Sequence, residues 1–151
     1  MYRNFVISML VLAVGSTAVL AQEKTAVNSP YAKRILLGRH FFSLQWISWD
    51  HYGRVNVTEK NDLLHIKGEQ KGRDNDDYLT IDGVVTEVNR YDFKFRGKIV
   101  TKVSHNNEGE PCVREGDMIF KITGKRKYWR LQEMDSPCEG IVDYVDIYFR
   151  K

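Results

Sequence analysis

The stretch between the two cysteines of the chain, Cys112 and Cys138, most constrains its fold. Apolar side chains recur at every second position in two segments of this stretch, residues 118–123 and 128–134. A period of two places alternate side chains on opposite faces, so each segment predicts a β-strand with one face toward a core. The turn between them, residues 124–127, holds one Gly and three cations, which suits an exposed reversal of the chain. The stretch is therefore a predicted β-hairpin whose open ends carry the cysteines.

Segments with the same alternation recur along the chain after His40. They are short and are separated by Gly, Asn and Asp, and the sequence contains no internal repeat. This spacing is typical of an antiparallel sheet in which neighbours in sequence are neighbours in space. We therefore predict an all-β fold of about nine or ten strands, an antiparallel meander that closes into a small barrel or folds as a bent sandwich. In a barrel, the strand over residues 41–49 meets the last strand, over residues 141–149.

Two polar segments of this region predict chain reversals. Asp82-Gly83 lies between the strand-like residues 78–81 and 84–88, and Asp-Gly is a strong hairpin signal. Residues 68–77 form the longest polar interruption, so we expect a surface loop there.

A single helix is predicted ahead of the sheet. Ser29 suits the N-cap position, Pro30 suits the first helical position, and Gly38 ends the segment. We expect this helix to plug or flank the sheet. Residues 22–29 before it are small and polar, which predicts a flexible N-terminus.

Residues 1–21 differ in composition from the rest of the chain. Arg3 gives a positive start, residues 5–20 are mostly apolar, and small residues precede Gln22, a pattern that predicts a cleaved signal peptide. The mature chain would then be a single domain over residues 30–151 without a membrane span, secreted or periplasmic. The formal net charge of the whole chain, +3, is too small to indicate nucleic acid as a partner.

The two cysteines predict a disulfide. An exported pair in an oxidising compartment most simply forms one bridge, Cys112 to Cys138. Closing a loop of this length stabilises the fold by about 3 kcal/mol through the unfolded state. The alternative is two free thiols.

The hairpin turn is the main candidate for a ligand-binding site. It joins cations to aromatic side chains, the chemistry that holds sulfated or carboxylated sugars, lipid headgroups or a nucleic acid backbone. An exposed Trp offers a flat face for a pyranose ring. The alternative is a turn that is basic for solubility. The candidate ligand-binding residues are Trp49, Lys125, Arg126, Lys127, Tyr128 and Arg130.

Catalytic and cofactor motifs are absent from the sequence. It contains no Gly-x-Ser-x-Gly, no His-Glu-x-x-His, no phosphate-binding Gly-rich loop and no Cys-x-x-Cys. We therefore predict no cofactor and assign no catalytic residue. Asp74, Asp76 and Asp77 are weak candidates for holding a hard cation, but their spacing fails the EF-hand pattern and an ordinary charged loop explains them.

Three functions fit this sequence. The first is a small exported binding protein, monomeric by default, for a small molecule, a carbohydrate or an envelope protein. The second is a hydrolase of carbohydrate or envelope substrates, whose carboxylate pair would come from residues such as Asp50, Glu87 and Glu133. The third is an inhibitor that presents the 124–127 turn as a loop stiffened by the disulfide. An apolar interior cavity would favour the binding protein, and converging carboxylates would favour the hydrolase. A filled interior with a projecting loop would favour the inhibitor.

Overall fold

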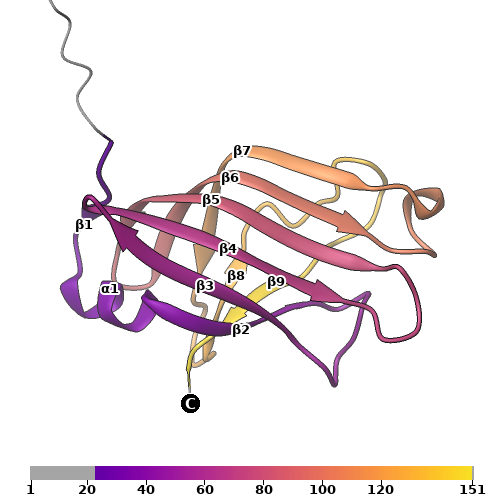
Figure 1. Cartoon of the computed structure of the whole chain (residues 1–151), viewed down its shortest axis with the longest axis horizontal. Helices are drawn as coiled ribbons and strands as arrows, with labels where there is room; N and C mark the ends of the chain where they lie inside the picture. Colours follow the sequence, from indigo (N-terminus) through magenta and orange to yellow (C-terminus); the bar gives the residue numbers. More distant parts are fainter. Residues whose placement is uncertain (1–22, 151) are drawn as a thin grey trace, which may run out of the picture.

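The computed structural model describes residues 23–150, which form a closed antiparallel barrel of eight strands (Figure 1). The predicted signal peptide, residues 1–21, lies outside the described residues. The elements in chain order are β1 Ala26–Val27, α1 Pro30–Leu36, β2 Gly38–Leu44, β3 Gly53–Lys60, β4 Leu63–Lys71, β5 Tyr78–Val88, β6 Asp92–Lys102, the short 3-10 turn η1 Asn107–Gly109, β7 Cys112–Lys121, β8 Tyr128–Leu131 and β9 Val145–Tyr148.

The barrel follows the predicted meander. Each strand from β2 to β9 pairs antiparallel with the next, and β9 pairs with β2, so that Ile147 lies opposite Phe42. The predicted meeting of the first long strand with the last is thereby confirmed, and the barrel, rather than the bent sandwich, is the fold. Closure leaves no edge among these eight strands, which removes a template for aggregation.

Large apolar side chains fill the barrel interior. The rings of Phe93 and Phe120 are stacked with their centroids 5.1 Å apart, and Phe95 and Trp129 meet them edge-on. An eight-stranded barrel is just wide enough for side chains to fill it. The largest fully buried side chains are Phe42, Phe93, Phe95, Phe120, Leu36, Leu44, Leu64, Ile66, Leu79, Ile81, Ile99 and Leu131. Binding at this barrel therefore has to use its outer surface and its ends.

Helix α1 covers one end of the barrel, as predicted. The Ser29 side chain accepts a hydrogen bond from the Ala32 backbone N–H at 3.2 Å, and Pro30 occupies the first turn. Ala32 and Leu36 are buried against the core. The buried ring of His40 in β2 lies with its Nε2 2.7 Å from the Leu36 carbonyl oxygen, which fastens the helix to β2.

Two expectations differ from the structure. Residues 26–27 form β1, which pairs parallel with β5, and the Thr25 hydroxyl donates to the Val85 carbonyl, so the segment expected to be flexible is tied to the barrel where it is described. The predicted hairpin turn at Asp82-Gly83 is wrong, because β5 runs straight through it. Gly83 instead lies opposite Gly97, and a Cβ there would be 2.6 Å from the Phe95 ring. The glycine serves close packing between strands.

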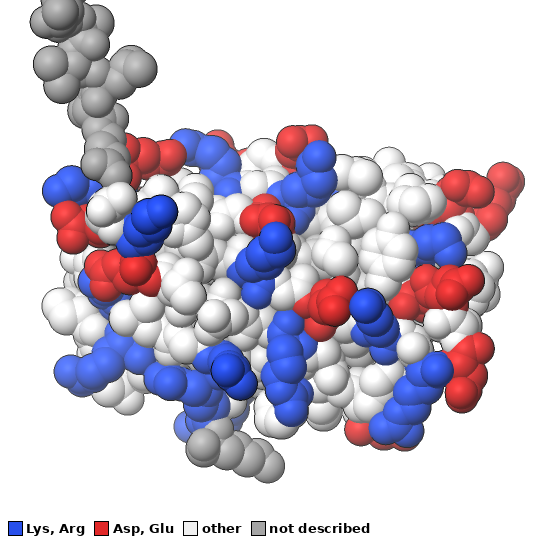
Figure 2. Space-filling model, viewed as in Figure 1, with Lys and Arg blue, Asp and Glu red and all other residues white. Residues whose placement is uncertain are grey.

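The two ends of the barrel carry opposite charge. The α1 end consists of α1, the turns at 61–62, 89–91 and 122–127, and the C-terminal residues after β9. Its charged residues are Lys33, Arg34, Arg90, Lys125, Arg126, Lys127 and Arg150, with Asp62 as the acidic exception. Figure 2 shows Lys and Arg gathered at the lower left, below α1, and acidic side chains along the opposite end.

The opposite end contains the predicted disulfide, Cys112–Cys138, which is confirmed. We call it the disulfide end. It consists of the connections 45–52, 72–77, 103–111 and 132–144. Its charged residues are Asp50, Asp74, Asp76, Asp77, Glu108, Glu110, Glu133, Asp135, Glu139 and Asp143, with Arg73 as the basic exception.

Candidate functional site

A groove of about 590 Å³ opens at the α1 end of the barrel. It runs between α1 and the turns at residues 89–91 and 122–127, so three segments far apart in sequence form its walls. Its apolar floor consists of Ala32, Ile35, Ile122, Trp129 and Phe149. The volume falls within the range of small-molecule sites.

Four cations surround this floor. Arg90 comes from the β5–β6 turn, and Lys125, Arg126 and Lys127 come from the β7–β8 turn; all four are exposed. Within residues 23–150, none of them forms an ion pair with a carboxylate, and no acidic residue lines the groove. Their positive charge is therefore available to an anion from solution.

Cations on the barrel wall are arranged differently. The Lys94 ammonium lies 2.7 Å from the Glu87 carboxylate, and the Arg96 guanidinium lies 2.8 Å from Asp117. These cross-strand pairs neutralise the wall locally. In the groove, by contrast, four cations without a carboxylate partner lie around one apolar floor.

Aromatic rings form the sides of the groove. Tyr31 of α1 and Tyr91 of the 89–91 turn both line it and are 63% and 54% exposed. The Arg90 guanidinium lies 5.1 Å from the centroid of the Tyr91 ring, and Arg126 lies 5.6 Å from that of Tyr128. Such stacking orients a guanidinium while leaving its N–H groups free to donate.

A second hollow of about 530 Å³ adjoins the groove and shares Lys127 and Phe149 with it. Here the rings of Phe41, Tyr52 and Tyr148 follow one another on the outer wall, with centroids 5.5 Å and 5.2 Å apart. We call these three rings the aromatic strip. Arg150 is the other residue at this hollow. The cationic rim and the aromatic strip therefore form one continuous surface.

Comparison with known proteins places this chain in a family. Residues 24–149 match the model of the PM1083 family. The chain belongs to the PM1083 family. It is 41% identical over 152 residues to the uncharacterized protein PM1083 of Pasteurella multocida (strain Pm70), an alignment that covers 97% of this chain and 98% of the relative. No solved structure matches.

The family assignment covers the whole barrel, including the groove, but the names that come with it state no ligand. The function therefore has to be inferred from the placement of the candidate residues. Lys125, Arg126 and Lys127 lie together in the groove, whereas Tyr128 lies under Arg126 without lining the groove itself.

Arg130 is placed differently from the groove cations. It donates two hydrogen bonds to the Asp146 carboxylate, at 2.8 and 2.7 Å, and its guanidinium covers the Tyr144 ring at 4.0 Å. Hydrogen bonding to Asp146 raises the pKa of Arg130. Because its charge is already matched, Arg130 supports the β8–β9 pair rather than offering a free cation.

Trp49 lies at the disulfide end of the barrel and is not brought together with the basic turn. It is 66% exposed, in the connection between β2 and β3. The groove residues that our sequence reasoning missed are Tyr31, Arg90 and Tyr91. The adjacent pair Arg90-Tyr91 repeats the cation and aromatic combination of the basic turn, and that signal could have identified it.

The three acidic candidates for a cation site lie in the 72–77 connection of the barrel. Asp77 is buried, and its carboxylate accepts hydrogen bonds from the Ser104 backbone N–H and hydroxyl at 2.8 and 3.3 Å. Asp74 and Asp76 are exposed. Across residues 23–150, no group of three or more His, Cys, Asp or Glu side chains is placed to hold a metal ion.

The carboxylates considered for a hydrolase have separate local partners. Glu87 pairs with Lys94 on the wall, and hydrogen bonding to Lys94 lowers its pKa. Asp50 accepts from Ser48, and Glu133 accepts from the Ile119 backbone N–H. The structure shows no pairing among these three that would serve glycoside cleavage.

The disulfide does not stiffen the basic turn directly. Cys112 begins β7 at the disulfide end, whereas residues 124–127 follow β7 at the α1 end. The bridge fastens the 132–144 connection instead. The mechanical argument for an inhibitor loop at the turn is therefore lost.

Proposed function

We propose that this chain is an exported binding protein that holds carbohydrates bearing carboxylate, sulfate or phosphate groups in the groove beside α1. The observation that carries the proposal is the set of four exposed, unpaired cations around an apolar floor. Guanidinium and ammonium groups bind such anions through charge-assisted hydrogen bonds. The filled interior supports binding at this outer groove rather than inside the barrel.

Aromatic side chains favour a sugar over a simple anion. Tyr31 and Tyr91 present flat faces beside the cations, and the aromatic strip continues from Lys127 along the wall. Ring faces pack on the apolar faces of pyranoses. A chain of sugars could thus extend from the groove onto the strip while its charged groups stay near the rim.

The disulfide supports the export part of the proposal. Cys112 and Cys138 form a disulfide that joins β7 to the 132–144 connection, and disulfides persist in oxidising compartments. Within residues 23–150, no helix has the length and apolar character needed to cross a membrane.

The test uses the oxidised mature chain and a fluorescently labelled heparin hexasaccharide as an anionic sugar probe. Replacing Lys125, Arg126 and Lys127 with Ala should weaken binding at least about tenfold and flatten its salt dependence, because three free cations are removed. Fluorescence anisotropy over a salt series measures both effects.

The matched control replaces Lys67, Lys71 and Lys98, three wall lysines in looser ion pairs at 3.4 to 3.6 Å. It changes the net charge equally and should bind the hexasaccharide as the parent does. If both triple variants weakened binding equally, the effect would come from net charge and not from the groove. Polyglutamate, neutral dextran and anionic lipid vesicles are comparison probes, and tighter binding to polyglutamate or vesicles than to the hexasaccharide would contradict the sugar assignment.

A further inference from the structure

A separate apolar cleft of about 420 Å³ lies at the disulfide end. It is formed by the 45–52 and 132–144 connections. The lining residues are Gln45, Trp46, Trp49, Ile141, Val142 and Tyr144. Trp49 and Val142 are 66% and 39% exposed, so two large apolar side chains of this one cleft face solvent. Exposed Trp is enriched among the residues that dominate protein interfaces.

Carboxylates border this cleft. Asp50 follows Trp49 in sequence, and Asp135 forms a β-bridge with Val142. Glu139 lies in the same connection, where it also lines the narrow space beside the disulfide, and neither this connection nor 45–52 contains a Lys or Arg. Of the cations nearby, Arg114 is paired with Asp143 and Arg130 with Asp146, and Arg73 attracts the Asp50 carboxylate. The border of the cleft is therefore negative.

The irregular 132–144 connection is held in place by buried polar groups. Arg114, which is 6% exposed, donates to the carbonyls of Glu133, Met134 and Asp135, and it binds the Asp143 carboxylate at 2.7 Å. Desolvating such an ion pair offsets much of its attraction, so its clearest effect is to select one conformation of the connection.

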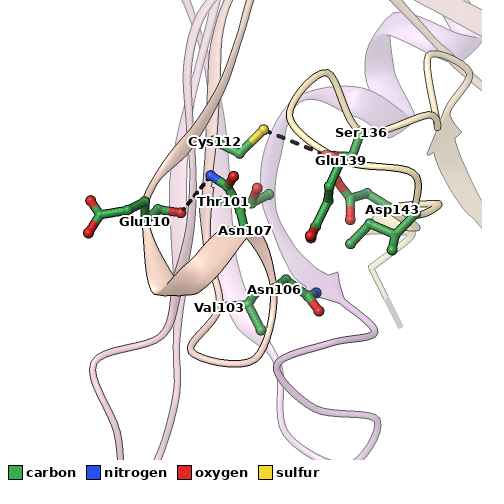
Figure 3. Close-up of a pocket in the computed structure, with 10 residues that line it drawn as sticks. Thr101, Val103, Asn106, Asn107, Glu110, Cys112, Ser136, Glu139 and Asp143 are labelled. Atoms are coloured by element: carbon green, nitrogen blue, oxygen red, sulfur yellow. Dashed lines mark hydrogen bonds between the residues drawn. The ribbon is translucent and has the colours of Figure 1, made fainter.

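Further bonds join this connection to its neighbours. The Gln45 side-chain amide donates to the Val142 carbonyl and accepts from the Tyr144 backbone N–H, both at 2.7 Å. It thereby takes the place of the backbone of a neighbouring strand. The disulfide from Cys112 fixes residue Cys138. Figure 3 shows the 103–111 and 132–144 connections facing each other here, and the space between them is only about 10 Å³. A cleft held this rigidly loses little conformational entropy when it binds a partner.

We propose that this cleft is a docking site for a partner protein, which inserts a Lys or Arg side chain flanked by apolar residues. The charge of the border selects the cation, and Trp49 with Val142 covers the apolar flanks and the aliphatic stem of the cation. The cleft and the groove lie at opposite ends of the barrel and share no lining residue, although Tyr52 of the aromatic strip belongs to the same connection as Trp49.

The experiment selects from a random dodecapeptide library displayed on phage, with the oxidised mature chain as the target. Enriched peptides should combine Lys or Arg with an aliphatic or aromatic neighbour. Synthetic copies should bind Trp49→Ala about tenfold more weakly. The neutral triple variant Asp50→Asn, Asp135→Asn, Glu139→Gln should also bind more weakly and with a reduced salt dependence.

A matched control neutralises Asp74, Asp76 and Glu108, exposed acids in the other connections of the same end. It should bind the peptides unchanged, and thermal unfolding checks that every variant is folded. The proposal is overturned if no basic peptide is enriched, or if Trp49→Ala binds the enriched peptides as the parent does. It is also overturned if sedimentation shows that the chain self-associates through Trp49, because the occupant would then be a second copy.

Discussion

The two ends of this barrel are built differently as well as charged oppositely. At the α1 end the strand connections are short, at residues 61–62, 89–91 and 122–127, and a helix rather than a loop closes the barrel. At the disulfide end three of the four connections, 45–52, 103–111 and 132–144, are longer than any of these turns, and a disulfide, a buried ion pair and side chain to backbone hydrogen bonds fasten this end. The comparison shows that the two ends of one sheet are held in place by different interactions.

The largest expected difference between the ends comes from Arg114. Replacing it with Met removes the charge partner of the buried Asp143 carboxylate, which keeps only the Trp46 indole N–H as a side-chain donor, and the donor of three carbonyls; this should cost about 3 to 5 kcal/mol in the free energy of unfolding. Urea unfolding measures the loss. As a control, Arg96→Met breaks an exposed pair with Asp117 and should leave the unfolding midpoint nearly unchanged.

If Arg114→Met were as stable as the Arg96 control, the buried pair would not fasten the disulfide end. A folded Arg114→Met variant should lose peptide binding at the Trp49 cleft while retaining hexasaccharide binding at the groove. Loss of both activities in a folded protein would show that the two ends are coupled.

Removing the disulfide should have the next largest effect. The bridge spans a sequence separation of 26, and opening it by Cys112→Ser with Cys138→Ser should lower the free energy of unfolding by roughly 3 kcal/mol. Under conditions where the variant remains folded, hydrogen exchange should rise first in the 132–144 connection. Exchange that rises first in α1 would contradict the separation between the ends.

Acid should act on the α1 end. His40 is buried between α1 and β9, and burial lowers its pKa, which the hydrogen bonds to the Leu36 and Tyr148 carbonyls offset only in part. The unfolded chain therefore takes up a proton at a higher pH than the fold does. Stability from this group is fully present above the ordinary His pKa of 6.5 and is lost as the pH falls through the lower folded value.

Thermal unfolding at stepped pH values measures this loss. His40→Gln should remove the pH dependence that arises below 6.5, whereas His65→Gln, at an exposed position, should retain it. A parent whose stability stays constant from pH 7.5 to pH 5 would contradict a lowered pKa for His40.

The sequence predicted the sheet because the barrel is made of local signals. Alternation in residues 118–123 and 128–134 put Phe120 and Trp129 on the inner face, where the structure has them. Asp82-Gly83 wrongly predicted a turn because the same dipeptide also occurs where two strands approach closely. The sequence does not reveal that Gly97 of β6 lies opposite Gly83, and this pairing is what requires a glycine there.

The groove was predictable only in part. The run 125–127 is visible as a local cluster of charge, but Tyr31 and Arg90 join it only after barrel closure brings α1 and two turns together. The different environments of Arg126 and Arg130 likewise depend on Asp146, which lies on a strand that pairs with β8 only in the folded chain.

The most direct test of the account is an NMR titration of the oxidised, isotopically labelled mature chain with the heparin hexasaccharide. The largest backbone amide shifts should fall on Tyr91 and residues 124–127, with the amides of Trp49 and Val142 nearly unchanged. Shifts concentrated at Trp49 and Val142, or spread evenly over the paired cations of the wall, would contradict it.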